Sequence, residues 1–495
     1  MSLKREVGLG LVWVAIATVG SRGLSFLRDM VLARLLVPGD FGLVGYALLI
    51  IGVLALFQEL GFSSALIYRN EDVDEAADVT FFTVIATSIV LYGLAWSAAP
   101  LVADFFRNEA LVRILRVLSL GLVISAISQV PLTLMSKQMG FKQRVIPELI
   151  AGLLGSGTSV VLALLGHGVW SIVYGQLIVS TTTTILVWFF IPWRPRLRYD
   201  RRVARELWQY GRNIIGSQVL VFFITNIDDA FVGRMRGDAD LGIYTLAYKF
   251  SNLPATHFSR VVSHVMFPAF SLVQNDIERL RRAFFRSVKF VSLAAFPITM
   301  VTIVFAEDFL VVAYGAKWFP AVVPLQFLAV YGLARAIAGN MGTVFKAGGK
   351  PKWLLYIAIW RLTMMATLLY PAIQWQGVTG VAVLSAVVAV IDFIISLVLT
   401  NRIIEASWRR YAAILVPMFV ASTVTALVAH RVYLLIADAI HPFLSLPLSG
   451  GLAVMLYLGI MYALDDEIRD VSGQAVQGLY HEVRRARLAR QSVEI

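Results

Sequence analysis

The feature that most constrains this chain is a succession of long apolar segments from one end of the sequence to the other. We count fourteen, each about 20 residues or more, which is the length of helix that crosses a hydrocarbon core of about 30 Å. Because the apolar runs are continuous and do not alternate with polar residues, they favour helices over the strands of a membrane barrel. The expected spans are 7–36, 40–66, 79–105, 110–136, 146–166, 169–192, 206–233, 241–271, 289–314, 320–345, 353–373, 378–401, 411–430 and 447–465.

The sequence therefore predicts an all-α polytopic membrane protein. The number of spans falls to about twelve if two marginal segments lie flat on the membrane. The chain is 58% hydrophobic and 15% charged, against about a quarter charged in soluble domains. No polar stretch is long enough for a soluble module, so we expect no nucleic-acid binding. The absence of cysteine excludes disulfides, thiolate metal sites and cysteine nucleophiles.

The connections between spans alternate sharply in positive charge. One set holds about 28 Lys and Arg residues and the opposite set about six, namely Arg34, Arg107, Arg234, Arg236, Lys317 and Arg431. The positive-inside rule then places both termini in the cytoplasm. We expect the protein to lie in the inner membrane. The first apolar block is long and carries charges, so we expect no cleavable signal peptide.

A weak internal repeat divides the chain. Residues 34–47 (RLLVPGDFGLVGYA) and 234–247 (RMRGDADLGIYTLA) match at an offset of 200, and Asp29 falls opposite Asp229. Two parallel six-helix bundles around a central cavity would follow, as in known transporters. The expected domains are 1–193 (first bundle), 194–205 (basic cytoplasmic linker), 206–403 (second bundle), 404–466 (two further helices) and 467–495 (basic tail). The tail fits either an amphipathic helix on anionic lipid or a partly disordered segment.

Charged residues within the first span are candidates for a binding site. Charges at mid-bilayer cost at least about 2.5–3.5 kcal/mol each, so they should face a cavity or a partner. The first span carries Arg22, Arg28 and Asp29 in the stretch SRGLSFLRD. The two arginines are about 9 Å apart along a helix. Pairing of Arg28 with Asp29 as a structural ion pair is the alternative.

Further charged and polar residues lie in the seventh and later spans. Together with those of the first span they form two sets. One set holds candidates for ion coupling or structural pairing, and the other holds candidates to line the cavity. The coupling or pairing candidates are Asp29, Asn226, Asp228, Asp229 and His264, and the cavity candidates are Arg22, Arg28, Lys249, Asn252, Arg260, Arg335 and Arg361.

A cationic cavity inside a membrane suits an anion that carries a lipid or a sugar. The planar guanidinium of arginine pairs with two phosphate oxygens. With the cell interior negative, an exported anion gains about 2.3 kcal/mol per charge per 100 mV. Coupling to the membrane potential, H⁺ or Na⁺ is left open. We expect no cofactor, metal site or catalytic residue.

Several stretches together resemble the polysaccharide transporter (Wzx/WzxC-type) family of the multidrug/oligosaccharidyl-lipid/polysaccharide exporter superfamily. The resemblance covers about the first 400 residues, and its motifs are LARLLVPGDFGLVGYA (32–47), QELGFSSALI (58–67), GHGVWSIVYGQL (166–177), NIDDAFVGR (226–234), LGIYTLAYKFSNLP (241–254), VMFPAFS (265–271) and YGAKWFPAVVPL (314–325).

The resemblance implies a flippase for undecaprenyl-pyrophosphate-linked oligosaccharide units, working with membrane lipids and with a polymerase and chain-length regulator of the same pathway. The first span also resembles that of the lipid II flippases, which implies that Arg22 and Arg28 line a cationic cavity. Lys249 stands where those proteins have an arginine, which keeps the charge and loses the bidentate geometry.

Two other functions remain as alternatives. A drug or small-cation antiporter of the same superfamily should have an acidic, aromatic cavity. A membrane polymerase or ligase should have a large outer loop, whereas the longest outer connection here, around 431–446, has roughly 16 residues. The D-x-D at Asp72 and Asp74 lies in a short loop without a domain around it.

Overall fold

The computed structural model describes residues 20–138, 141–253, 255, 266 and 269–470. Within these ranges the chain is almost entirely α-helical and contains no strand, so the prediction of an all-α membrane protein is confirmed. The first described helix covers residues 20–35. The labelled α-helices are α2 (Pro38–Gln58), α3 (Phe62–Tyr68), α4 (Val73–Phe106), α5 (Ala110–Leu118), α6 (Leu120–Lys137), α7 (Phe141–Leu164), α8 (Trp170–Phe190), α9 (Arg201–Arg236), α10 (Asp238–Ser251), α12 (Ile277–Val304), α13 (Ala306–Phe309), α14 (Val322–Ala347), α15 (Lys352–Ile404), α16 (Trp408–Ile436) and α17 (Pro442–Leu464).

Eleven helical segments of the described residues are long and apolar enough to cross a membrane. One of them, α15, contains two predicted spans, 353–373 and 378–401. Gln376 and Gly377 have non-helical backbone angles between these spans and kink the helix. The first and eighth predicted spans lie only partly within the described residues.

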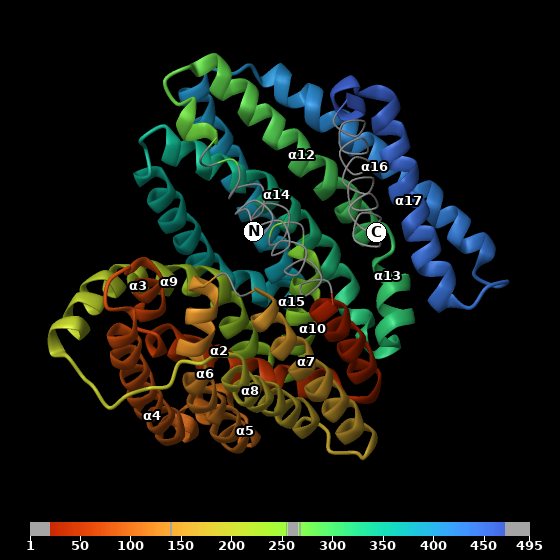
Figure 1. Cartoon of the computed structure of the whole chain (residues 1–495). Coiled ribbons are helices and arrows are strands. Elements are labelled where there is room, and N and C mark those ends of the chain that lie inside the picture. Colours follow the sequence, from red (N-terminus) through yellow and green to blue (C-terminus); the bar gives the residue numbers. More distant parts are fainter. Residues whose placement is uncertain (1–19, 139–140, 254, 256–265, 267–268, 471–495) are drawn as a thin grey trace, which may run out of the picture. The chain divides into compact units, whose positions relative to one another are not determined.

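The chain packs as two compact units. Unit 1 comprises residues 1–248, 313–324 and 358–385, and unit 2 comprises 249–312, 325–357 and 386–495. In unit 1 the helices α2 to α8 pack closely, with α7 against α8 and α6 between α4 and α8 (Figure 1). In unit 2 the side chains of Phe284, Phe345 and Tyr457 are fully buried in the core that α12, α16 and α17 share. Segments far apart in the sequence therefore build each unit.

Two repeated glycines bring the starts of α2 and α10 into backbone contact within unit 1. A Cβ atom on Gly42 would lie 1.8 Å from the carbonyl oxygen of Asp238, and one on Gly242 would lie 2.0 Å from that of Pro38. Only glycine allows this approach, since real Cβ atoms essentially never come so close to another atom. The two positions are partners in the internal repeat, so the repeat has a structural counterpart at this crossing.

The helix α12 starts earlier than the sequence analysis expects. The span was predicted to begin at residue 289, whereas the helix begins at Ile277, after Asp276 caps it by accepting a hydrogen bond of 3.0 Å from the Arg279 backbone N–H. The charges of residues 277–288 interrupt the apolar run, so the sequence predicts a connection there. A helix end that leaves the hydrocarbon can carry such charges, so this stretch continues the helix.

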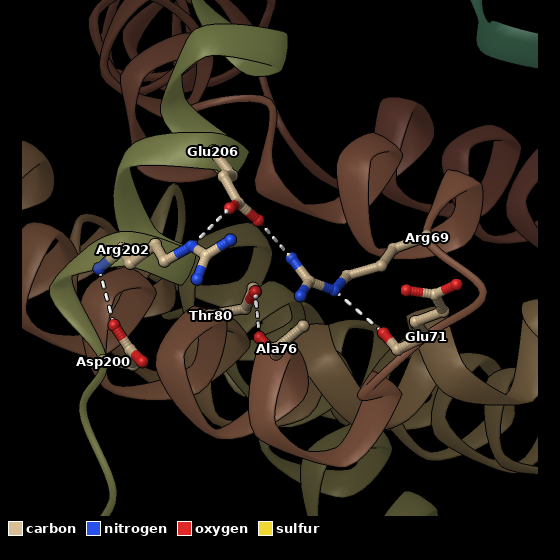
Figure 2. A network of polar contacts seen from close by, with 7 residues as sticks. All are labelled: Arg69, Glu71, Ala76, Thr80, Asp200, Arg202 and Glu206. Atoms are coloured by element: carbon tan, nitrogen blue, oxygen red, sulfur yellow. Dashed lines mark hydrogen bonds and ion pairs between the residues drawn. The ribbon is translucent and has the colours of Figure 1, made fainter.

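Acidic residues contact the basic linker and the start of α9 within unit 1 (Figure 2). Glu206 in α9 accepts contacts from Arg69 at 2.9 Å and from Arg202 at 3.3 Å. The carboxylate of Asp78 in α4 also accepts a 3.0 Å hydrogen bond from the Arg196 backbone N–H. The linker therefore follows a defined path, although its charge alone would predict a solvated loop.

Candidate functional site: charged residues of the membrane helices

The first described helix places Arg22 and Arg28 nearly two turns apart. The Nε and Nη2 atoms of Arg28 lie 2.9 Å and 2.8 Å from Oδ1 of Asp29. The side chain of Arg28 stays 26% exposed and that of Asp29 11%, while Arg22 is exposed. The ion pair that the sequence analysis kept as an alternative is thus present. The Arg28 side chain uses its Nε and Nη2 atoms in this pair and keeps part of its surface exposed.

The end of this helix is held by residues that the sequence analysis did not select as functional. Lys317 donates hydrogen bonds to the backbone carbonyls of Arg34, at 2.9 Å, and of Leu36. The fully buried Trp318 donates from its indole N–H to the carbonyl of Ala33 at 2.9 Å. The last carbonyls of a helix lack partners inside it and attract cations. The motif YGAKWFPAVVPL therefore fixes the helix that carries Arg28.

The seventh predicted span lies within α9 and contains two adjacent carboxylates in different settings. The buried Asp228 accepts a 2.5 Å hydrogen bond from the Tyr244 hydroxyl of α10. The Oδ1 atom of Asp229 is buried without a hydrogen-bond partner among the described residues. Asn226 donates to the Phe222 carbonyl at 2.8 Å, one helical turn back. Asp228 thus has a structural partner, in line with the alternative of structural pairing. The coupling role of Asp229 stays a prediction.

The remaining cavity candidates are divided between the two units. Arg361 belongs to unit 1 with Arg22 and Arg28, whereas Lys249, Asn252 and Arg335 belong to unit 2. Lys249 is exposed in the last turn of α10, and the Nη1 atom of Arg335 donates to the Tyr331 hydroxyl at 2.7 Å. Arg260 and His264 lie outside the described residues. That these residues line a single cavity stays a prediction.

Two adjoining cavities of unit 1 reveal further candidates. One, of about 450 Å³, lies among apolar side chains of α2, α4 and α9 and includes Asn226. The other, of about 540 Å³, shares Phe105 with it and adds Arg107, Arg234 and Tyr370. The Arg234 guanidinium stands 5.3 Å from the ring centroid of Phe105. In the sequence Arg107 and Arg234 stand only as charges of outer connections, because the residues that line this cavity come from separated helices.

The described residues do not provide a cluster of ligands for a tightly bound metal ion. No three His, Asp or Glu side chains gather closely enough among them to hold one. Asp228 and Asp229 supply carboxylate oxygens, which suit a hard cation such as Na⁺. The expectation that the protein binds no metal cofactor remains a prediction.

The chain has many apolar helices that carry charged side chains inside the expected spans. This combination is typical of a polytopic membrane transporter. The chain belongs to the family described as "Polysaccharide biosynthesis protein", whose model matches residues 31–323. The predicted family resemblance is confirmed.

Curated relatives of similar length support this assignment. Teichuronic acid biosynthesis protein TuaB of Bacillus subtilis (strain 168) is 25% identical over 435 residues, which cover 88% of this chain and 90% of the relative. Lipopolysaccharide biosynthesis protein WzxC of Escherichia coli (strain K12) is 26% identical over 433 residues, which cover 87% and 88%. Succinoglycan biosynthesis transport protein ExoT of Rhizobium meliloti (strain 1021) is 28% identical over 331 residues, which cover 66% of each chain.

Solved structures share the fold. Lipid II flippase MurJ in an inward closed conformation is similar with a TM-score of 0.71 at 16% identity, covering 92% of this chain and 99% of that one. An inward-facing multidrug resistance MATE family transporter of the MOP superfamily is similar with a TM-score of 0.62 at 18% identity, covering 80% and 99%. At these identities the likeness shows the fold alone.

Proposed function

We propose that the protein is a flippase that carries undecaprenyl-pyrophosphate-linked oligosaccharide units from the cytoplasmic to the outer leaflet of the inner membrane by alternating access. The observation that carries the proposal is the partly accessible Arg28 inside the first membrane helix of a polysaccharide biosynthesis family member. A relative named a transport protein for succinoglycan biosynthesis and a similar fold in a lipid II flippase support it.

The proposed substrate site uses the cations that the sequence predicts to line a cavity. Arg22, Arg28, Lys249, Arg335 and Arg361 would bind the pyrophosphate. Arginine contributes bidentate hydrogen bonds to phosphate oxygens in a setting where water competes weakly. Two phosphate charges moving outward would gain about 4–5 kcal/mol at 100 mV, so the membrane potential alone could drive export. Coupling to H⁺ or Na⁺ through Asp229 belongs to the same proposal.

The protein acts in this proposal as a transporter and not as an enzyme, and both termini face the cytoplasm. A polymerase and a chain-length regulator would use the exported units. A drug antiporter of the same fold is the second candidate, because a multidrug transporter shares the architecture. The cations of the first helix disfavour cationic drugs as cargo.

The first test follows lipid-linked glycan in cells depleted of the native protein. Cells complemented with Arg28→Gln or Lys249→Gln should accumulate lipid-linked units on the cytoplasmic leaflet, with export reduced at least about tenfold. The control is Arg409→Gln, which removes an exposed arginine at the start of α16. Normal arrival of the units at the outer leaflet in depleted cells, with only polymer length altered, would refute the flippase proposal.

The Arg28–Asp29 pair allows a sharper experiment. If Arg28 serves only to neutralise Asp29, the double variant Arg28→Gln/Asp29→Asn should restore export that Arg28→Gln has lost, because no unpaired charge remains. If Arg28 binds the substrate anion, the double variant should regain thermal stability and still fail to export. The comparison therefore separates a structural ion pair from a binding cation at matched membrane levels.

A further inference from the structure

Unit 2 contains a basic pocket whose charged lining residues are not among the cations of the proposed substrate site. It has a volume of about 940 Å³ and lies among the first turns of α12, the first turns of α16 and the segment after α17. We name it the α12–α16 pocket. Among the described residues, its lining includes four cations and one carboxylate, namely Arg282, Arg286, Lys289, Arg410 and Glu467, and apolar side chains such as Met266, Phe290 and Ile414.

The cations of the pocket are arranged by helix geometry and by aromatic rings. Arg282, Arg286 and Lys289 follow one another at spacings of four and three residues, which places them on one face of α12. The Arg410 guanidinium lies 4.9 Å from the ring centroid of Phe285, and that of Arg286 lies 6.0 Å from that of Phe290. Such stacking restricts long side chains and leaves guanidinium N–H groups available to an anion.

The acids near the pocket offset only part of its positive charge. Lys289 contacts Asp465 and Glu467, each at 2.8 Å, and Arg286 contacts Glu467 at 3.1 Å. In the part of the chain that the structure describes, Arg282 and Arg410 form no ion pair with an acid. These two arginines therefore give the pocket an excess of positive charge that a ligand can neutralise.

We propose that the α12–α16 pocket binds the phosphate headgroup of an anionic membrane phospholipid. Arg282 and Arg410 hold the phosphate oxygens, and an acyl chain continues along Phe290, Ala413 and Ile414. The position on the helices supports a lipid over a soluble anion, since the long apolar run of α12 begins directly after Lys289. Basic pockets between membrane helices, at the depth where the apolar part of the helices begins, suit lipid headgroups.

The experiment measures the binding of phosphatidylglycerol to the purified full chain in a phosphatidylcholine background, by native mass spectrometry across a lipid titration. The pocket variant is Arg282→Gln/Arg410→Gln. The matched control is Arg279→Gln/Arg409→Gln, which removes two exposed arginines from the same two helices and leaves the pocket lining intact. The basic tail is identical in all proteins, so its own attraction for anionic lipid cancels.

We expect the pocket variant to weaken phosphatidylglycerol binding about tenfold and the control to change it less than about threefold. Equal losses in both variants, or equal binding of phosphatidylcholine, would overturn the proposal. So would undecaprenyl phosphate displacing phosphatidylglycerol at equal mole fraction, since the carrier lipid would then be the occupant. If the double variant is not monodisperse, phosphatidylglycerol binding is measured for the single variants Arg282→Gln and Arg410→Gln. Because binding is read without transport, the outcome is independent of the flippase proposal.

Discussion

At the scale of single residues, the cations of this chain serve different purposes that their positions in the sequence do not distinguish. Lys317 caps a helix, Arg28 pairs with the adjacent acid, and Arg282 lines a pocket without an ion pair among the described residues. In the sequence Lys317 and Arg282 are only charges beside apolar segments, whereas Arg28 stands next to Asp29. The partner decides the role, and the partner is often far away in the chain.

Asp465 illustrates how such a partner affects stability with pH. Burial raises the pKa of this carboxyl, but the hydrogen bonds from Lys289 and from the Ile468 backbone N–H outweigh it, so the pKa of Asp465 lies below its usual range. A carboxyl with a lowered folded-state pKa stabilises the fold above its ordinary pKa. That stability is lost as pH falls through the folded-state value.

We therefore expect Asp465→Asn to lower the thermal unfolding temperature at pH 7, with the difference from the wild type shrinking as the pH falls to about 3. Thermal unfolding of the purified protein in detergent across this range measures it. Asp466→Asn is the control, because the Asp466 side chain is 90% exposed and exposed ion pairs contribute little. A difference that stays constant with pH would contradict the assignment.

At the scale of elements, the start of α2 and the start of α10 cross where the internal repeat is strongest. The crossing also has polar support nearby, since the Tyr46 hydroxyl of α2 donates to the Gly233 carbonyl of α9 at 2.9 Å. Helices approach this closely only where small residues face each other. The glycine of each half thus makes room for the backbone of the other.

Gly42→Ala and Gly242→Ala should each destabilise the protein by about 1–3 kcal/mol, because the added methyl group must push a backbone carbonyl away. Thermal unfolding and the monodisperse yield after detergent extraction measure the effect. Gly93→Ala in α4 is the control, as a Cβ there meets nothing within 4 Å and alanine favours the helix. If all three variants unfold at the same temperature, the crossing does not hold the two helices.

At the scale of the whole molecule, the alternating charge of the connections predicts the orientation in the membrane. The chain has no cysteine, so a single introduced cysteine reports its own side of the membrane without background. Exposed positions are available near both ends of α17, at Ala439 and at Asp466.

We expect a membrane-impermeant thiol reagent to label Ala439→Cys in spheroplasts and to label Asp466→Cys only after lysis. The physical reason is the excess of cations on the side of Asp466, which resists transfer across the membrane. Labelling of both variants in lysed cells is the control, because it shows that each cysteine can react with the reagent. The opposite pattern would reverse the orientation and with it the proposed direction of export.

The class of fold was predictable because membrane spans follow from hydrophobicity alone. The kink at Gln376 and Gly377 also fell between two predicted spans, since the apolar run is interrupted there. The helix α12 begins before the span that was predicted from residue 289, because helix ends outside the hydrocarbon carry the charges that mark connections. The pocket around Arg107 and Arg234 was missed because its lining comes from three separate parts of the chain.

The sequence by itself determined that this chain is helical, spans a membrane and belongs to its family, because in lipid each backbone polar group must be satisfied within its own helix. Tertiary structure decided which charges find a partner outside their own stretch of the chain. Arg28 meets Asp29 through local geometry, whereas Lys317, Lys289 and Arg410 find their contacts through packing between distant helices. Electrostatic interactions depend on distance and burial, and only the folded chain sets these two quantities.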